Sequence, residues 1–182
     1  MRSVIIQQAP REVLIALPDC ETDIYRVHQL VWNHVARAAK SRTTTPSFIY
    51  RIDGGMIRVR SYDLPGAIAP LPTPATEGHT NIRLDLAAVQ GTNHDEPIAP
   101  ERLEQWCTNK LAAAGFGVDA IAIEEYETRS GTKVECGRIH KIQIPVVRVR
   151  AKLKVVDIRS CETAWVRGIG RGKRFGLGML AH

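Results

Sequence analysis

The segment WVRGIGRGKRFGLGMLAH, residues 165–182, is the most informative part of the sequence. Its five glycines permit positive φ angles and a close approach of the backbone to a partner, and three cations, Arg171, Lys173 and Arg174, lie between them. We predict the end of a helix, then a glycine-rich basic loop, then a short apolar strand. A loop of this composition suits the phosphodiester backbone of a nucleic acid.

Two nucleotide-binding motifs do not fit this loop. A P-loop has four residues between its first glycine and a Gly-Lys pair, followed by Ser or Thr and a long helix; here Arg174 takes the Ser/Thr position and only eight residues follow it. A dinucleotide-binding fingerprint belongs near the start of a βαβ unit, with an acidic residue about 20 positions further on. The remaining alternative is a solvated turn that is basic by chance.

Charge is distributed unevenly along the chain. The net charge is +6, but residues 129–182 hold 13 Lys and Arg against three Asp and Glu, whereas residues 1–128 hold 12 against 16. A chain with one strongly cationic half is typical of a protein that places one face on a polyanion such as nucleic acid.

The composition indicates a folded protein, which we expect in the cytoplasm and not at a membrane. Hydrophobic residues make up 44% of the chain, no run of 18 apolar residues occurs, and residues 1–13 lack the pattern of a signal peptide. Four widely spaced cysteines, Cys20, Cys107, Cys136 and Cys161, form no CxxC pair. They indicate buried reduced thiols rather than a zinc site or a disulfide framework.

The first half alternates strand and helix patterns. We predict a strand over 11–17, a helix capped by Thr22 or Asp23 that runs to about Lys40, a β-hairpin of 47–53 and 56–63 around Gly54-Gly55, and a strand over 81–89. Residues 1–10 are ambiguous, and the four prolines from Pro65 to Pro74 indicate an exposed connection.

The second half shows a similar mixture. We predict a helix from Glu101 that stops at Gly115, a strand over 116–127, and a turn or hairpin tip over 129–137. An edge strand, a bend at Pro145, a strand over 146–156 and a short helix capped by Asp157 follow. In the strand over 146–156, strict alternation puts Arg148, Arg150, Lys152 and Lys154 on one face.

These patterns predict an α+β protein with two tandem ferredoxin-like (βαββαβ, RRM-like) halves. The first domain would span residues 1–92 and carry the helix of the candidate catalytic residues. The second would span residues 99–182 and carry the glycine-rich loop, with the connection near 91–100.

A ribonuclease can use the 2′-hydroxyl of RNA as the nucleophile, so the protein supplies a base, an acid and cations that hold the phosphate. His28 is the best candidate because imidazole titrates near neutrality. Tyr25 and Trp32 share its flank of the predicted helix. A histidine beside an apolar stripe is nevertheless more often structural, and this interpretation is stronger still for His34, His79, His94, His140 and His182.

The motifs YRVHQLVW (25–32) and GIGRGKRFGLG (168–178) together resemble the CasE family of CRISPR-associated repeat-processing endoribonucleases. The resemblance implies a metal-independent enzyme without a cofactor, which binds the stem-loop of a CRISPR repeat. It would cleave precursor crRNA at the 3′ base of the stem, leaving a 2′,3′-cyclic phosphate and a 5′-hydroxyl. It would also join other subunits of a surveillance complex of type I-E or type IV.

Carried onto this sequence, the resemblance makes His28 the catalytic histidine and Tyr25 its partner, with Lys173 and Arg171 near the scissile phosphate or the stem. The chain departs from the family by its shortness, its acidic first half and the additional Arg174. No HExxH or similar spacing supports a metal site.

The predicted RNA contacts are cationic, because an A-form stem is recognised mainly through its shape and phosphates. Aromatic residues, at 5%, are too few for broad stacking on single strands. The candidate RNA-binding residues are Arg129, Lys133, Arg138, Lys141, Arg148, Arg150, Lys152, Arg167, Arg171, Lys173 and Arg174. Two alternatives stay open: a noncatalytic RNA-binding subunit of a CRISPR ribonucleoprotein complex, and an unrelated nucleic-acid-binding α+β module.

Overall fold

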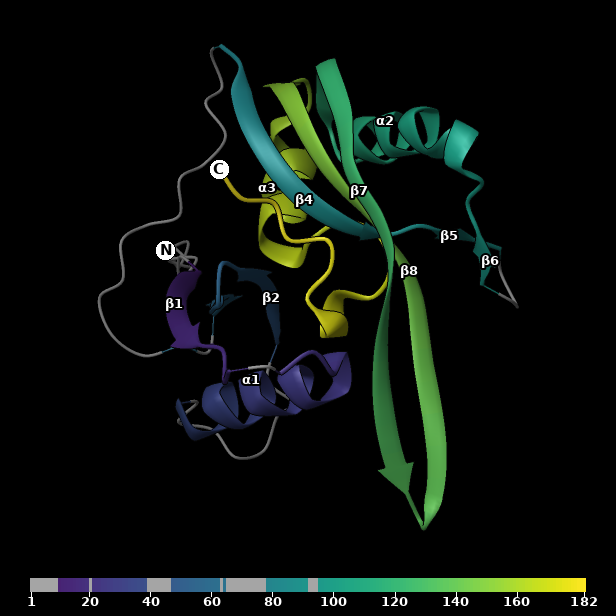
Figure 1. Ribbon diagram of the computed structural model, residues 1–182. Helices are drawn as coiled ribbons and strands as arrows, with labels where there is room; N and C mark the ends of the chain where they lie inside the picture. Colours follow the sequence, from purple (N-terminus) through teal and green to yellow (C-terminus); the bar gives the residue numbers. More distant parts are fainter. Residues whose placement is uncertain (1–9, 20, 39–46, 63, 65–77, 92–94) are drawn as a thin grey trace, which may run out of the picture.

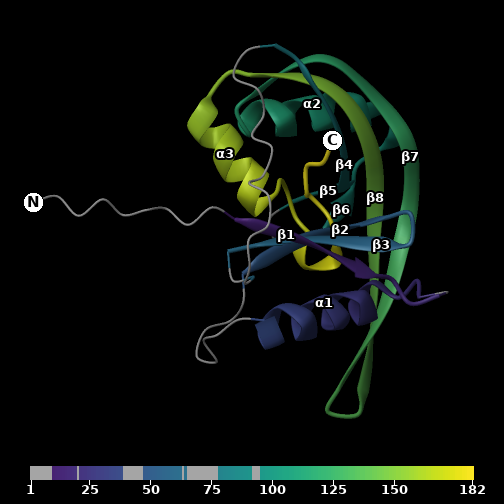
Figure 2. The same cartoon turned by 90° about the vertical axis from the view of Figure 1, so that its left-hand side faces the viewer.

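The computed structural model of the chain describes residues 10–19, 21–38, 47–62, 64, 78–91 and 95–182 (Figure 1). Its first sheet is antiparallel, with the order β1-β3-β2, and consists of β1 (Arg11–Ala16), β2 (Phe48–Asp53) and β3 (Met56–Ser61). Helix α1 (Ile24–Ala38) covers one face of this sheet. Figure 2 shows α1 below the sheet.

The local sequence explains α1 and its packing. Asp23 caps the helix, because its Oδ1 accepts hydrogen bonds from the backbone N of Tyr25 at 2.8 Å and of Arg26 at 3.1 Å. Three valines at helical spacing are buried against Tyr50 and the other apolar residues of the sheet: Val27, Val31 and Val35. The predicted helix and the predicted hairpin at Gly54-Gly55 are confirmed.

The second sheet is also antiparallel and has the order β4-β8-β7. It consists of β4 (Thr80–Ala87), β7 (Phe116–Glu135) and β8 (Arg138–Val155). The 3-10 turn η1 (Pro100–Arg102), α2 (Leu103–Ala113) and α3 (Ile158–Arg167) complete this half, and both helices bury residues in one core with the sheet. In Figure 2, α2, α3 and β4 lie above the first sheet. The predicted caps are confirmed, since Gly115 follows α2 at φ +89° and Asp157 accepts a hydrogen bond from the Arg159 backbone N at 3.1 Å.

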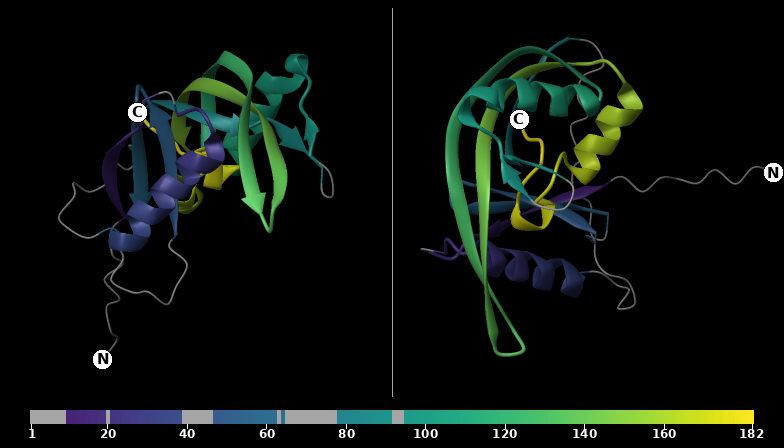
Figure 3. Two further views of the ribbon diagram at one scale, coloured as in Figure 1. Left: turned by 60° about the horizontal axis from the view of Figure 1, so that its bottom comes forward. Right: turned by 90° about the vertical axis from the view of Figure 1, so that its right-hand side faces the viewer.

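Strands β7 and β8 continue beyond β4 as a two-stranded extension, residues 128–145, which we call the arm (Figures 1 and 3). The predicted tip over 129–137 was too broad, because β7 runs to Glu135 and only Cys136 and Gly137 form the turn. The predicted bend at Pro145 was wrong. Its carbonyl oxygen accepts from the Ala88 N on the β4 side, so the N–H that proline lacks is not needed for pairing with β7.

The predicted terminal strand was also wrong. The 3-10 turn η2 (Lys173–Phe175) is followed by residues that make one isolated bridge to β4, between Arg83 and Ala181. Positive φ angles at Gly176 and Gly178 interrupt the extended run. Within the predicted loop over 91–100, Glu96–Pro97 forms the short strand β6, which pairs with β5 (Val89–Gln90).

Both sheets have the same order of strands, and each contains one βαββ unit. In the second half, α3 and the bridge at Ala181 extend the unit toward βαββαβ, so the tandem ferredoxin-like prediction is confirmed. Strand β4 lies within residues 1–92 but pairs with β8 of the second sheet. We therefore propose a domain boundary between β3 and β4. The prolines at 65–74 and residues 1–9 lie outside the described residues.

No helix in the described ranges is long and apolar enough to cross a membrane.

Arg60 of β3 joins the two halves. Its side chain is buried, and its Nε donates to Glu12 Oε1 at 2.8 Å. The same guanidinium donates to the carbonyl oxygens of Trp165 and Leu180 and lies 4.7 Å from the centroid of the Trp165 ring. One cation therefore holds β1 against α3 and the C-terminal segment.

We expect Arg60→Ala to lower the free energy of unfolding by about 3–5 kcal/mol, because Glu12 would become a half-buried charge without its main partner. Urea unfolding at neutral pH measures this loss. The matched control is Arg58→Ala, which removes another partner of Glu12 but from a side chain that is 39% exposed. We expect this control to cost at most about 1 kcal/mol, and equal losses for the two variants would contradict the proposed role of Arg60.

Candidate active site and nucleic-acid interface

The glycine-rich loop, residues 168–178, lies against the first sheet, and Tyr50 holds it there. The Tyr50 hydroxyl donates to the carbonyl oxygen of Arg174 at 3.0 Å. Gly176 permits this approach, because a Cβ there would lie 2.8 Å from Cε2 of Tyr50. Burial raises the pKa of Tyr50, so its hydroxyl stays protonated and able to donate. The loop of the second half is thus fixed next to α1 of the first.

His28 faces this loop from α1, and aromatic side chains surround it. The centroid of its ring lies 6.3 Å from that of Phe175 in the loop and 5.9 Å from that of Phe48 in β2. Tyr25 and Trp32, the neighbours predicted from the helical spacing, are at 6.4 and 6.2 Å. The structure therefore brings the candidate histidine and the basic loop together.

The electrostatics of His28 favour a neutral ring. Burial lowers the pKa of His28, the positive charge of Arg174 lowers it further, and a hydrogen bond with the Arg174 backbone offsets part of this effect. Its Nδ1 is buried and has no hydrogen-bond partner among the described residues. A neutral imidazole can accept a proton through its unprotonated nitrogen.

A cavity of about 450 Å³ opens beside His28. Its walls come from α1, the arm and the glycine-rich loop, and they include Tyr25, Lys133 and Arg174. Sequence reasoning missed four lining residues, Gln29, Asn33, Ile142 and Phe175. Gln29 is detectable four residues after Tyr25 on the same helix face, and Asn33 four residues after Gln29, whereas Ile142 and Phe175 reach the site only through the tertiary fold.

The arm is anchored to the start of α1. Asp23 uses both oxygens, because Oδ1 caps the helix while Oδ2 accepts from the Thr132 backbone N at 2.8 Å. Gly131 lets the strand come this close, since a Cβ at that position would lie 2.9 Å from the Tyr25 N. This contact places Lys133 beside the cavity.

The candidate RNA-binding cations fall into two groups. Five have carboxylate partners: Arg129 and Arg148 on Asp85, Arg150 on Glu124, Lys133 on Glu135, and Arg171 on Asp95. Burial alone would raise the pKa of Asp85, but its contacts with Arg148 and Arg129 lower it overall. Among the described residues, the other six make no ion pair: Arg138, Lys141, Lys152, Arg167, Lys173 and Arg174.

Within the described part of the chain, no three His, Cys, Asp or Glu side chains are grouped closely enough to hold a metal ion. Cys107 and Cys161 are buried free thiols as predicted, Cys136 is exposed at the tip of the arm, and Cys20 lies outside the described residues.

Comparison with known proteins supports one family. A family model described as CRISPR associated protein matches residues 69–181. The fold is similar to that of a CRISPR endoribonuclease Cse3 bound to a 19-nucleotide RNA, with a TM-score of 0.75, 18% identity, and coverage of 95% of this chain and 97% of the other. No curated protein sequence matches significantly.

Two further structures are similar. The CRISPR-associated protein Cas6e from Escherichia coli str. K-12 has a TM-score of 0.63 at 18% identity, with coverage of 94% of this chain and 97% of the other. A chain of a CRISPR RNA-guided surveillance complex has a TM-score of 0.65 at 19% identity, with coverage of 93% and 97%. The resemblance to the CasE family that the two motifs predicted is confirmed.

We expect the His28 ring to titrate below 6.5, the ordinary pKa of histidine. The unfolded chain then binds more protons as the pH falls through 6.5, so the free energy of unfolding decreases from about pH 7 downward until the folded pKa is passed. NMR titration of the ring and urea unfolding at pH 7 and pH 5 measure the two effects. His28→Gln should lose this part of the pH dependence and His34→Gln should keep it, and a His28 pKa above 6.5 would contradict the prediction.

Proposed function

The chain belongs to the CRISPR-associated protein family, and we propose that it is an endoribonuclease that binds the stem-loop of a CRISPR repeat and cleaves precursor crRNA. The observation that carries this proposal is the position of His28. Its ring packs against Phe175 of the basic loop, and the cavity beside it is also lined by Tyr25, Lys133 and Arg174.

The proposed reaction needs neither a metal ion nor an added nucleophile. The 2′-oxygen of the RNA attacks the adjacent phosphorus, and the bond from phosphorus to the 5′-oxygen of the next nucleotide breaks. One proton leaves the 2′-hydroxyl and another is added to the leaving 5′-oxygen. The products are a 2′,3′-cyclic phosphate and a 5′-hydroxyl.

We assign the removal of the first proton to His28, because its lowered pKa keeps the imidazole neutral near pH 7. Tyr25, one turn earlier on α1, can donate its hydroxyl proton toward a phosphate oxygen or toward the leaving group. Arg174 and Lys133 line the same cavity and would stabilise the charge that develops on the phosphate.

We propose that the RNA stem lies along the arm and the glycine-rich loop. The cations without ion pairs, above all Lys173 and Arg174, would contact phosphates directly. Those with partners, such as Arg148 and Arg150, would contribute less because Asp85 and Glu124 offset their charge. The chain would act in the cytoplasm with the other subunits of a surveillance complex of type I-E or type IV, a setting supported by the similar chain within such a complex.

A second candidate is a noncatalytic RNA-binding subunit. The packing of His28 among the rings of Tyr25, Trp32, Phe48 and Phe175 favours it, because a purely structural histidine is held in the same way. Such a protein binds the repeat hairpin and yields no product.

We expect His28→Ala to retain affinity for the repeat hairpin while its single-turnover cleavage rate falls by about 10²- to 10⁴-fold, the usual contribution of one general base. His34→Ala, an exposed residue of the same helix, is the matched control and should cleave normally. A 2′-deoxy substitution at the scissile nucleotide should block cleavage, and EDTA should leave the rate unchanged. Full activity of His28→Ala would contradict the assignment, and loss of activity in EDTA would contradict the mechanism.

We expect Lys173→Ala and Arg174→Ala each to reduce the slope of log affinity against log salt concentration by about one, because each removes one phosphate contact. Arg150→Ala should change the slope less, since Glu124 already offsets its charge. Electrophoretic mobility shifts at several salt concentrations measure the three slopes. A larger change for Arg150→Ala than for Lys173→Ala would place the RNA on the sheet instead of the loop.

A further inference from the structure

We propose that a second cavity, adjacent to that of His28, binds the first unpaired nucleotide on the 3′ side of the scissile phosphate. This inference rests on the proposed ribonuclease function and names a further part of its substrate.

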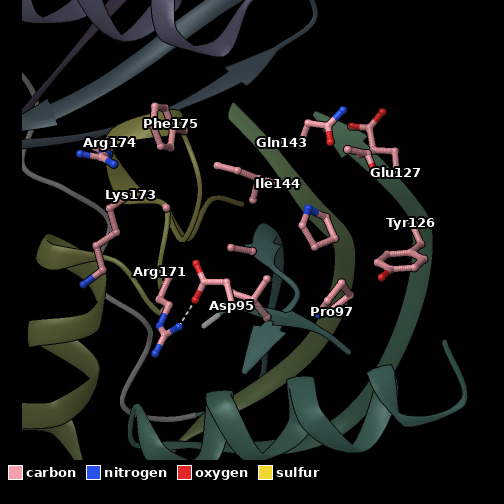
Figure 4. Close-up of a pocket in the computed structure, with 16 residues that line it drawn as sticks. Asp95, Pro97, Tyr126, Glu127, Gln143, Ile144, Arg171, Lys173, Arg174 and Phe175 are labelled. Atoms are coloured by element: carbon pink, nitrogen blue, oxygen red, sulfur yellow. Dashed lines mark hydrogen bonds and ion pairs between the residues drawn. The ribbon is translucent and has the colours of Figure 1, made fainter. Parts of the chain in front are cut away.

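The second cavity has a volume of about 860 Å³ and lies between the glycine-rich loop and the base of the arm. Figure 4 shows Arg171, Lys173 and Arg174 of the loop on one side, and Tyr126 and Gln143 of β7 and β8 on the other. The volume lies in the range of small-molecule sites and accommodates a nucleotide.

The two cavities are neighbours at the loop, because Arg174 and Phe175 line both. They also follow one another along the arm. Lys133 and Ile142, toward the tip, line the cavity of His28, whereas residues 126–128 and 143–145, toward the sheet, line the second. A strand of RNA whose phosphate lies at His28 can therefore place its next nucleotide in the second cavity.

The direction of the RNA follows from the proposed cleavage at the 3′ base of the stem. We place the stem along the arm, which extends away from the second sheet toward its tip (Figures 1 and 3). The nucleotide 3′ of the cut is outside the stem and continues toward the sheet, where the second cavity is.

Tyr126 provides a fixed stacking surface for the base. Its ring is 39% exposed, and its hydroxyl donates to the carbonyl oxygen of Ile98 at 3.2 Å, which restrains the ring. An exposed aromatic ring that loses little freedom on binding is well suited to stack on an unpaired base. Pro97 and Pro145 add apolar surface to the same cavity.

Polar groups of the cavity match the rest of a nucleotide. Lys173 makes no ion pair with any described residue and can meet a phosphate, whereas Arg171 is held by Asp95 and by the Gly91 carbonyl oxygen. The amide of Gln143 offers both donors and an acceptor to the edge of a base. The cavity thus combines a stacking surface, a cation that no described carboxylate neutralises, and a group that can read a base.

The test measures the dissociation constants of hairpins of the associated CRISPR repeat, made uncleavable by a 2′-deoxy scissile nucleotide. An abasic residue at the first position 3′ of the cut should weaken binding about 10-fold, the typical effect of losing one stacked base. An abasic residue three positions further along, beyond the cavity, should change the affinity less than twofold. Equal affinities for the intact hairpin and the first abasic hairpin would overturn the proposal.

Tyr126 variants assign the effect to this cavity. Tyr126→Leu should weaken binding of the intact hairpin about 10-fold and add little to the effect of the abasic residue, because both changes remove the same contact. Tyr126→Phe keeps the ring and should bind within about threefold of the unchanged protein. Fully additive effects of Tyr126→Leu and the abasic residue would overturn the proposal.

These binding experiments and the cleavage assay can fail independently of each other. Failure of the 2′-hydroxyl-containing hairpin to be cleaved would refute the ribonuclease and leave the affinity difference to decide whether a nucleotide binds here. Normal cleavage with no sensitivity to the 3′ nucleotide would refute the second site alone.

Discussion

The hydrogen bond from the Tyr50 hydroxyl to the Arg174 carbonyl oxygen is the contact on which the candidate site depends. Tyr50 belongs to the first sheet and Arg174 to the loop of the second half, so this bond fixes the two halves where their reactive groups meet. The bond is formed only because Gly176 lacks a side chain that would strike the Tyr50 ring. With the loop held in this position, Phe175 packs against His28. Burial lowers the pKa of that histidine, and the charge of Arg174 lowers it further. The buried phenol of Tyr50 therefore helps to fix the surroundings of the candidate base.

The arm forms the third wall of the site, and a single side chain, that of Asp23, holds it in place. Asp23 caps α1 with one oxygen and holds Thr132 of the arm with the other, so the start of the helix and the position of the arm are determined together. Arg60 provides the corresponding contact on the far side, where it joins β1 to the carbonyl oxygens of Trp165 and Leu180. Arg60 is buried, and a buried charge is costly unless its hydrogen bonds are satisfied, which favours one relative position of the two halves over others.

Local signals in the sequence predicted most of the elements and the pairing of His28 with Tyr25. The caps at Asp23 and Asp157, the turn at Gly54-Gly55 and the alternation along β8 depend on neighbouring residues, and all are confirmed. The errors have a different origin. A proline in a strand predicts a bend, unless it is known that Pro145 lies just beyond the end of β4. The pairing of Arg148 with Asp85 follows from the register of β4 and β8, which places the two residues opposite each other. Such features depend on pairing between distant strands, which no local pattern encodes.

Ion pairs with carboxylates change how the excess of positive charge in residues 129–182 is interpreted. Residues 129–182 look like a uniform polycation in sequence, but carboxylates from β4, from β7 and from the segment around Asp95 offset much of the charge on β8 and the loop. Lys173 and Arg174 have no carboxylate partner among the described residues, and these two cations lie beside the cavities. A polyanion is attracted most strongly where positive charge is not offset, so association would bring a phosphodiester to the loop in preference to the sheet. Under the proposed function, the carboxylates that pair with Arg148, Arg150 and Arg171 would leave Lys173 and Arg174, in the loop that packs against His28, as the preferred contacts of a phosphodiester.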